Sequence, residues 1–284
     1  MQADNHPPLV SCDWLAERLD WPEIVVLDAS FFLPNQQRNP VEEYRQAHVP
    51  GARFFDIDEV ADKATHLPHM LPNPQQFADA VGVLGVGNDT HIVVYDSNFF
   101  MASARLWWTF RVFGHDRISV LDGGLARWKA EGRPLTVKLA TVTPRRFDAN
   151  FRPQLVRDLE QIKALLKEAG AQILDARSPG RFAGIEPEPR AGLRSGHIPG
   201  SFNLFFKNLI DETTYRLKSP GELEGLYRAA GIDARRPVVT TCGTGVTASI
   251  LALGLYCIAN ENAAVYDGSW TEWGGRGDTP VSRD

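Results

Sequence analysis

The sequence has little cysteine. Among its 284 residues only Cys12, Cys242 and Cys257 are cysteines, an odd number and widely spaced. Such a set does not form a disulfide framework and favours a reducing compartment, for which we expect the cytoplasm. Three cysteines without clustered histidines also argue against a zinc site, and we expect no metal and no other cofactor.

Positive charge and long apolar runs are lacking as well. The formal net charge is −5, which gives no electrostatic case for binding nucleic acid or an anionic membrane. No apolar run is long enough to span a bilayer, and residues 1–10 lack the basic-then-apolar order of a signal peptide. The composition is otherwise that of a globular protein, with 43% hydrophobic and 23% charged residues. At this length we expect two domains.

A third absence lies near the far end of the chain, where no lysine or arginine occurs between Cys242 and Ser249. Residues 238–241, two valines and two threonines, predict a short buried strand. An apolar run of helical length, residues 246–259, follows the cysteine. Cys242 therefore lies at a strand-to-helix turn, where backbone amides converge and favour a thiolate or a bound anion. Gly243 and Gly245 allow the backbone angles that turn those amides inward.

The loop that begins at Cys242 could have other functions than to hold a nucleophile. Cysteine is among the most buried residue types, so Cys242 could be a passive core residue. A phosphate-binding Walker loop is excluded because no Gly-Lys-Ser/Thr sequence follows. The tyrosine-phosphatase loop requires an arginine six residues after its cysteine, where this chain has Ala248. We interpret Cys242 as a nucleophile held by amides and hydroxyls, without side-chain cations from its own loop.

The chain contains an internal repeat. Three landmarks recur in one order at nearly one spacing: Asp28 and Asp175 (147 residues apart), His48 and His197 (149), and Trp128 and Trp273 (145). A period this long indicates two tandem domains and not a solenoid. We predict domains over residues 1–140 and 158–284, joined by a linker over 141–157.

Strands alternate with helical stretches in each half. In the first half a strand over 92–95, a helix over 102–113 and a strand over 118–121 follow one another. This alternation predicts an α/β fold, with two mainly parallel sheets that carry helices on both faces. Reactive loops of such sheets lie at the carboxyl ends of strands, which is where Cys242 falls.

The repeat also provides an internal comparison. Alignment of residues 93–97 with 238–242 places Ser97 opposite Cys242. Bulky residues follow Ser97, whereas glycines follow Cys242. We therefore expect chemistry only in the second domain.

This combination resembles the rhodanese superfamily of sulfurtransferases in its two-domain form, from about Trp14 to Trp273. The loop Cys-Gly-Thr-Gly-Val-Thr is similar to that of the 3-mercaptopyruvate sulfurtransferases, which usually have serine where this chain has Thr244. Thiosulfate sulfurtransferases generally carry Arg-Lys in place of Gly243 and Thr244. The resemblance therefore implies transfer of sulfur from 3-mercaptopyruvate through a persulfide on Cys242. The loop residues expected to contact the donor or the persulfide are Gly243, Gly245, Val246 and Thr247.

Two arginines fit the same resemblance. Arg181 and Arg190 lie in a segment similar to the one with which the family binds the substrate's carboxylate and keto oxygen. A planar guanidinium suits a carboxylate because it donates two charge-assisted hydrogen bonds. The alternative is that each arginine pairs with Glu186 or Glu188 on a solvated loop.

The resemblance further implies an acid–base relay. Asp58 and His69 match a family pattern in which an aspartate and a histidine act with the loop hydroxyl, here that of Thr244. Asp58 could instead cap a helix, and His69 could be a surface histidine beside Pro68. The nearby His66 leaves the choice of histidine open.

The acceptor is expected to be a thiol, either a small dithiol or thioredoxin, or cyanide. Three other functions remain open: a thiosulfate:cyanide sulfurtransferase, a non-catalytic rhodanese-like binding or sulfur-carrier module, and a related phosphatase or arsenate reductase. The last is disfavoured because the loop contains no arginine. Several other residues are expected to stabilise the fold without taking part in the chemistry: Asp28, Asp122, Asp175, Asp267, His48, His197, Trp107, Trp108, Cys12 and Cys257. Of these, Cys257 is expected to be buried within the apolar helix.

Overall fold

A computed structural model describes residues 6–33, 36–168 and 170–283. Its contacts divide the chain into two units that are not simply its two halves. The first unit comprises Met1–Asp62, Leu71–Arg152 and Asp211–Leu217. The second comprises Lys63–Met70, Pro153–Ile210 and Lys218–Asp284. The segment expected as a linker, 141–157, is shared between them, and the expected domain ranges also include residues 1–5, 34–35, 169 and 284, outside the described residues.

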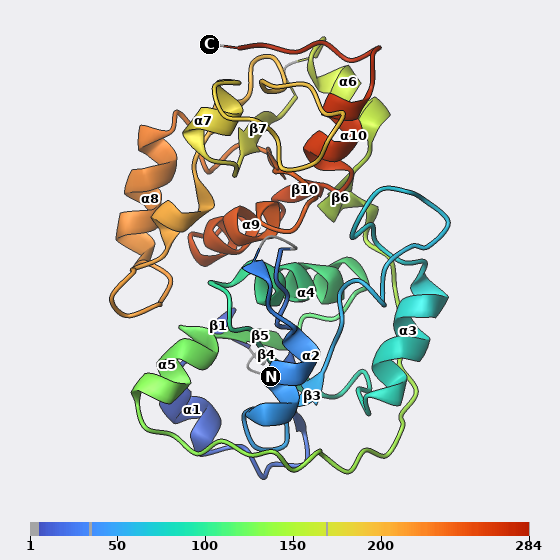
Figure 1. Cartoon of the computed structure of the whole chain (residues 1–284), viewed down its shortest axis with the longest axis vertical. Coiled ribbons are helices and arrows are strands. Elements are labelled where there is room, and N and C mark those ends of the chain that lie inside the picture. Colours follow the sequence, from blue (N-terminus) through green and yellow to red (C-terminus); the bar gives the residue numbers. More distant parts are fainter. Residues whose placement is uncertain (1–5, 34–35, 169, 284) are drawn as a thin grey trace. The chain divides into compact units, whose positions relative to one another are not determined.

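The first unit is built on a five-stranded sheet, in which all pairs of neighbouring strands are parallel (Figure 1). Val93, Val94 and their neighbours are fully buried, as expected for a central parallel strand covered on both faces. In spatial order the strands are β1 (Leu9–Val10), β5 (Ile118–Leu121), β4 (His91–Tyr95), β2 (Ile24–Asp28) and β3 (Arg53–Phe54).

The second unit repeats this topology. Its five strands are again all parallel, with β9 at the centre of the sheet. In spatial order they are β6 (Val156–Arg157), β10 (Ala264–Tyr266), β9 (Val238–Thr241), β7 (Gln172–Asp175) and β8 (Phe202–Asn203). The predicted α/β fold with two parallel sheets is thereby confirmed.

Helices cover both faces of each sheet (Figure 1). In the first unit one face packs on α1 (Cys12–Ala16), α2 (Pro40–Gln46) and α5 (Gly124–Ala130) through a core that includes Leu15, Tyr44 and Trp128. The other face packs on α4 (Met101–Val112), and Phe77 of α3 (Pro74–Val83) contacts Phe110 of α4 edge to face. Because these side chains are almost fully buried, removal of their apolar surface from water stabilises both faces of the sheet.

The second unit has the corresponding layers. Its core on one face joins α6 (Leu159–Leu165) and α10 (Ser269–Gly275) to the sheet. On the other face α9 (Ala248–Cys257) packs against β9 and β10, and α8 (Pro220–Ala229) packs against α9. Three shorter elements complete the unit: η2 (Pro153–Leu155), α7 (Pro179–Phe182) and η3 (Phe206–Leu209).

The repeat extends to the helix starts. α3 and α8 both begin with a proline preceded by a capping residue, Asn73 and Ser219 respectively. In both caps the residue three positions on, Gln76 or Glu222, bonds back to the cap, which satisfies backbone groups that an isolated helix leaves open. These matched caps fix the register of the two copies at 146 residues in this region.

Within the part of the chain that the structure describes, no helix is long and apolar enough to cross a membrane.

Candidate active site

Cys242 directly follows β9, the central strand of the second sheet. Its β-branched residues Val238 to Thr241 favour an extended backbone that is buried on both sides. Helix α9 begins at Ala248, so the predicted strand–loop–helix order is confirmed. The side chain of Cys242 is almost fully buried, with 2% of its surface exposed. Burial alone would fit a core cysteine, so the polar surroundings of the loop decide its interpretation.

The start of α10 clamps the peptide that follows the cysteine. The amide of Cys242 donates to Ser269 Oγ at 3.2 Å, and Trp270 N donates to the Cys242 carbonyl at 2.9 Å. Thr271 donates to the Gly243 carbonyl twice, from its backbone at 2.9 Å and from its hydroxyl at 2.7 Å. Ser269 holds this position with φ at 50°, in the left-handed region that side chains other than glycine rarely adopt. The backbone at Cys242 is therefore fixed by strained, buried partners.

The loop amides themselves remain available. Among the described residues, the backbone N–H groups of residues 243–247 donate to no protein acceptor. The Thr244 hydroxyl likewise forms no hydrogen bond within the described chain, although the side chain is only 8% exposed. Gly245 has φ at 76°, which allows the loop to turn back without strain. Several donors thus lie in a buried loop without a partner, as expected of a site that binds an anion.

The sheet register corrects the predicted alignment of the two loops. Asp28 pairs with Tyr95 in the first sheet, and its repeat partner Asp175 pairs with Thr241 in the second. The next residue along each strand, not Ser97, therefore corresponds to Cys242, and that residue is Asp96. The hydrogen bonds agree, since Leu125 N donates to the Asp96 carbonyl as Trp270 N does to that of Cys242. The sequence alignment was one residue out because the two loops share no residues after the strand.

The Asp96 carboxylate accepts hydrogen bonds from one amide of its own loop and from two amides of the first turn of α4. Its oxygens accept from the backbone N–H groups of Asn98 (2.9 Å), Ala102 (3.1 Å) and Ser103 (2.8 Å). Burial raises the pKa of Asp96, and these amides act in the opposite direction. In the first repeat, backbone N–H groups after β4 therefore point at the carboxylate of Asp96, the residue that follows this strand. In the second repeat that side chain is the thiol of Cys242.

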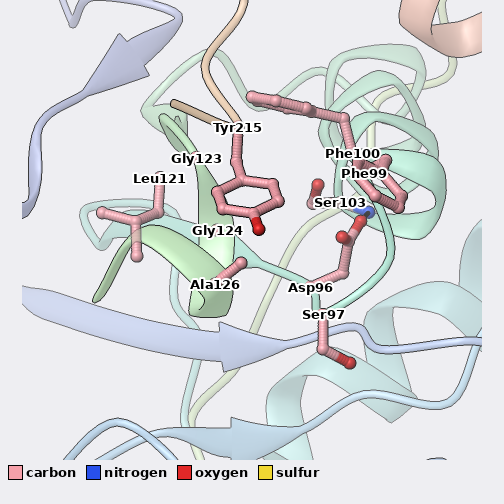
Figure 2. A pocket seen from close by; sticks show the side chains of 10 residues that line it. All are labelled: Asp96, Ser97, Phe99, Phe100, Ser103, Leu121, Gly123, Gly124, Ala126 and Tyr215. Carbon is pink, nitrogen blue, oxygen red and sulfur yellow. Dashed lines mark hydrogen bonds between the residues drawn. The ribbon is translucent and has the colours of Figure 1, made fainter. Parts of the chain in front are cut away.

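A small pocket surrounds Asp96 in the first unit (Figure 2). Its volume of about 40 Å³ is room for little more than a water molecule, so it does not admit a substrate. Tyr215, from the segment 211–217, points into it, and its φ of 61° is left-handed. The first repeat therefore satisfies its own loop, whereas the loop amides 243–247 of the second repeat have no acceptor among the described residues.

Arg181 lies beside the Cys242 loop. A Cβ built on Gly243 would be 3.3 Å from Arg181 Nη2, so the guanidinium rests against the bare backbone of that glycine. Its own partner is Glu188, which accepts from Nη2 at 2.6 Å. The ion pair that the sequence offered as an alternative is thus present for Arg181, and the residues around Glu188 are exposed, although its own carboxylate is buried (2% exposed). Arg190 is half-buried on the same segment.

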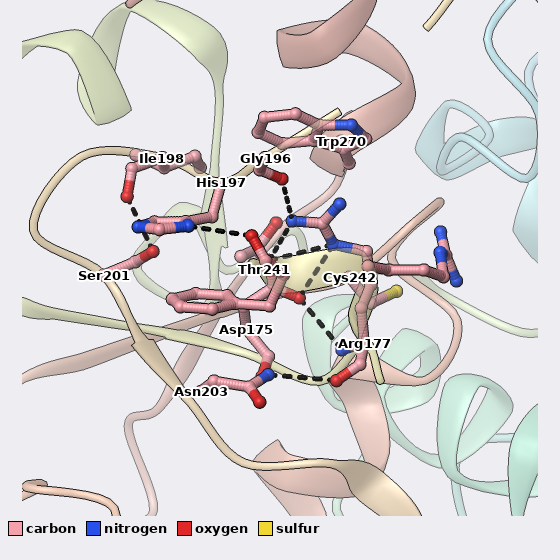
Figure 3. A network of polar contacts seen from close by, with 12 residues as sticks. Asp175, Arg177, Gly196, His197, Ile198, Ser201, Asn203, Thr241, Cys242 and Trp270 are labelled. Atoms are coloured by element: carbon pink, nitrogen blue, oxygen red, sulfur yellow. Dashed lines mark hydrogen bonds and ion pairs between the residues drawn. The ribbon is translucent and has the colours of Figure 1, made fainter. Parts of the chain in front are cut away.

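Behind Arg181 lies a buried network centred on Arg177 (Figure 3). The Arg177 side chain is fully buried; its guanidinium donates to Asp175 (2.6 Å) and to Glu188 (2.8 Å) and lies 4.3 Å from the Trp270 ring. Burial would lower the pKa of Arg177, but Asp175 and Glu188 outweigh it, so the pKa is raised and the charge is kept. Figure 3 shows the sulfur of Cys242 close to this network.

Arg177 and Ser269 were not predicted from the sequence, and Glu188 was expected only as a possible surface partner of the arginines. The repeat contains the signal for all three. Arg177 replaces Ser30 of the first copy, and Ser269 replaces Gly124, which has nearly the same φ of 55°. The backbone of Phe182 contacts His197 as Tyr44 contacts His48, but across 15 residues instead of four. The extra residues of the second copy include Glu188 and Arg190.

The relay residues lie in different parts of the chain. Asp58 is exposed and belongs to the first unit; the cap of this turn is Asp56, whose carboxylate accepts from Asp58 N at 2.8 Å. His69 is buried and belongs with the second unit, whereas His66 is exposed. His69 has φ at 61° and lies four residues before its helix cap, as Tyr215 does in the other copy. Tyr215 is therefore the repeat partner of His69.

The remaining candidates have structural surroundings. His48 and His197 are buried and stack on Tyr44 and Phe182, at centroid distances of 4.1 and 3.8 Å. Cys12 is buried, and burial raises the pKa of its thiol to about 11. Cys257 is half-buried at the end of α9, so the expectation of a buried side chain is wrong: its neighbours Tyr256 and Ile258 are also only partly buried. Within the described residues no cluster of three or more metal-binding side chains occurs.

Together these features define a class: a two-domain parallel α/β protein with a cysteine loop at the carboxyl end of the central strand of its second sheet. The model of the rhodanese-like domain matches the chain twice, at residues 11–131 and 158–276. The chain belongs to the rhodanese family, as the sequence resemblance implied.

Similar proteins cover nearly the whole chain. The human 3-mercaptopyruvate sulfurtransferase is 42% identical over 93% of this chain and 91% of its own length. The bovine thiosulfate sulfurtransferase is 44% identical over the same shares of the two chains. In structure, SseA of Escherichia coli, a 3-mercaptopyruvate sulfotransferase, superposes with a TM-score of 0.85 at 39% identity, covering 93% of this chain and 98% of the other. Overall identity thus supports a sulfurtransferase without separating the two donors.

Proposed function

We propose that this protein is a 3-mercaptopyruvate sulfurtransferase with Cys242 as its nucleophile. The observation that carries the proposal is the loop that begins at Cys242: among the described residues the amides of residues 243–247 have no acceptor, and Arg181 lies against Gly243. Relatives that bear this name are similar over nearly the whole chain. An α-keto acid carries one carboxylate for a guanidinium to bind and requires no cationic loop.

The chemistry consists of two half-reactions. The Cys242 thiolate attacks the sulfur of 3-mercaptopyruvate, so that an S–S bond forms while the donor's C–S bond breaks. The electron pair of that bond passes to the donor's C3 as an enolate, which is protonated and leaves as pyruvate. A thiolate acceptor then attacks the outer sulfur of the persulfide, takes it up, and releases the Cys242 thiolate. Because both steps use one nucleophile, ping-pong kinetics are expected.

The loop would stabilise the charge that develops on sulfur. Gly243, Gly245, Val246 and Thr247 supply amides to the persulfide in a buried setting, where donors already in place stabilise charge more than water does. In the first repeat the loop amide of Asn98, two residues after Asp96, donates to the Asp96 carboxylate at 2.9 Å, which supports this role of the loop. Arg181 and Arg190 would bind the donor's carboxylate and keto oxygen.

The proton would be handled by His69 and the Thr244 hydroxyl, with Asp58 as the carboxylate that orients the imidazole. The repeat supports His69 over His66. His69 corresponds to Tyr215, which lines the pocket around Asp96, and Asp96 corresponds to Cys242.

Small-molecule sulfur compounds and acceptors are the substrates of this class of enzyme. We propose a thiol acceptor, either a small dithiol or thioredoxin. A reducing compartment, the cytoplasm, fits three free cysteines. One Arabidopsis relative is named as mitochondrial, so fractionation of cells that express the chain is the test of compartment.

Mass spectrometry tests the mechanism directly. After exposure to 3-mercaptopyruvate without acceptor, the peptide that carries Cys242 should gain the mass of one sulfur atom. The Cys242→Ser variant should gain none and should release no pyruvate. If the wild-type peptide keeps its mass while pyruvate is released, the persulfide mechanism is wrong.

A donor comparison tests the substrate. The bovine relative makes thiosulfate a specific alternative. With both donors at equal concentration and cyanide as acceptor, kcat/KM should be higher for 3-mercaptopyruvate. A higher value for thiosulfate would overturn the donor assignment and leave the persulfide mechanism standing.

A further inference from the structure

Glu188 lies between the two arginines of the buried network. Its Oε1 accepts from Arg177 Nη1 at 2.8 Å and from Arg181 Nε at 3.3 Å. Its Oε2 accepts from Arg181 Nη2 at 2.6 Å. The carboxylate therefore grips one edge of the Arg181 guanidinium through Nε and Nη2. The remaining donors, on Nη1, stay available for a ligand.

The network connects Arg181 to the sheet. Asp175 ends β7 and pairs with Thr241, the residue before Cys242. Its carboxylate binds Arg177 Nε and Nη2, and Arg177 also donates to the Gly196 carbonyl at 2.8 Å. A fixed series of contacts thus runs from the strand beside the nucleophile, through Arg177 and Glu188, to Arg181.

We propose that Glu188 is a positioning residue that sets the donor specificity of the enzyme by holding Arg181 over Gly243. This inference rests on the proposed function of Cys242. Arg181 alone is a long side chain with 23% of its surface exposed, and it would otherwise sample many rotamers. Glu188 also offsets the charge of Arg181, so the site presents a directed donor pair rather than a mobile cation. That arrangement suits a monocarboxylate on an α-keto acid better than a dianion such as thiosulfate.

The first repeat supports a functional role for this contact. Its fold is the same, but it has Ser30 at the position of Arg177 and lacks the extra segment that carries Glu188. The fold therefore forms without the network. Only the copy with the nucleophile contains it.

Two variants test the proposal against one control. Glu188→Gln keeps the size of the side chain but removes its charge, and Glu188→Asp keeps the charge but cannot reach both arginines. Glu186→Gln is the control, because Glu186 lies on the same segment and accepts from Ser178 Oγ without contacting either arginine. Each protein is assayed with 3-mercaptopyruvate and with thiosulfate, and its thermal unfolding is recorded.

For both Glu188 variants KM for 3-mercaptopyruvate should rise about tenfold or more, because an anchored charge-assisted contact is lost. The ratio of kcat/KM for 3-mercaptopyruvate to that for thiosulfate should fall by a similar factor. The control should keep the wild-type ratio. Alkylation of Cys242 by neutral iodoacetamide should proceed at the wild-type rate in folded variants, which reports an intact loop.

An unchanged donor ratio in Glu188→Asp, or an equal loss with both donors, would overturn the proposal, since a merely structural role lowers both activities together. If Glu188→Gln fails to fold, Glu188→Asp decides the result. Failure of the proposed function would look different: wild-type Cys242 would then form no persulfide at all.

Discussion

Ser269 holds the backbone of Cys242 from a left-handed conformation. Its hydroxyl donates to the Tyr266 carbonyl at 2.7 Å, and its oxygen accepts from Cys242 N at 3.2 Å. A residue with a Cβ pays about 1 kcal/mol or more for such a φ, and Gly124 avoids that cost in the first repeat. The strained serine occurs in the copy that carries the nucleophile, which links the strain to the site.

Replacement of this serine separates strain from hydrogen bonding. Ser269→Gly relieves the strain and Ser269→Ala keeps it, while both remove the bond to Cys242 N. Persulfide formation should slow about tenfold in both, because the nucleophile is less well oriented. Ser269→Gly should be the more stable variant by about 1 kcal/mol. Single-turnover mass spectrometry and urea unfolding measure the two effects, and a wild-type rate in Ser269→Gly would contradict the role of the hydroxyl.

At the scale of single residues, the sequence predicts the type of chemistry that a side chain can perform better than it predicts the hydrogen-bond partners of that side chain. A cysteine followed by glycines, with no cation, was enough to predict Cys242 and its loop. Ser269 could not be predicted because nothing local marks a serine as left-handed. The burial of Glu188 could not be predicted either, since its two arginines lie 7 and 11 residues away on a segment without regular periodicity.

At the scale of the elements, the central strand of the first unit, β4, begins with a buried histidine. His91, its first residue, is 4% exposed and lies 2.9 Å from Ser119 Oγ. Since Ser119 donates its own proton to the Pro7 carbonyl, His91 Nε2 must be the donor in this contact. Burial lowers the pKa of His91 to about 4, and the nearby His6, Arg117 and His115 act in the same direction.

Protonation of His91 should therefore lower the free energy of unfolding at acidic pH. The folded state binds the proton less readily than the unfolded state, whose pKa is near 6.5. The stabilising effect is complete above about pH 6.5 and is lost as the pH falls toward 4. Between pH 7 and 4.5 the wild type should lose about 2 kcal/mol more unfolding free energy than His91→Gln, which keeps the donor to Ser119. Urea unfolding at both pH values measures this, and equal losses would contradict it.

Most elements could be predicted from local pattern. The strands β4, β5 and β9 and the helices α4 and α9 lie within a residue or two of the expected positions. The alignment of the two loops was wrong by one residue because their sequences share no landmark. Only the pairing of each strand with its neighbour fixes that register.

For the whole molecule, the repeat allows a comparison of two copies of one fold, one with Asp96 and the other with Cys242 after the central strand. Asp96→Cys, made in the Cys242→Ser background, would place a sulfur at the equivalent position of the first copy. We expect no persulfide there, because that copy lacks the arginine network and its pocket is only about 40 Å³. Mass spectrometry of the peptide with residue 96 is the measurement, and circular dichroism checks folding. Sulfur loading at the wild-type level would show that a thiol and its loop suffice.

Each structural unit also contains a short segment from the other half of the sequence. Asp122, in the first unit, accepts from Arg216 Nε at 2.7 Å and from Leu217 N at 2.9 Å, residues encoded more than 90 positions later. Conversely, the segment that carries His69 belongs with the second unit. A chain bisected after Arg152 would separate each unit from a segment that packs with it. The boundary between the two sequence repeats is therefore not the boundary between the two structural units.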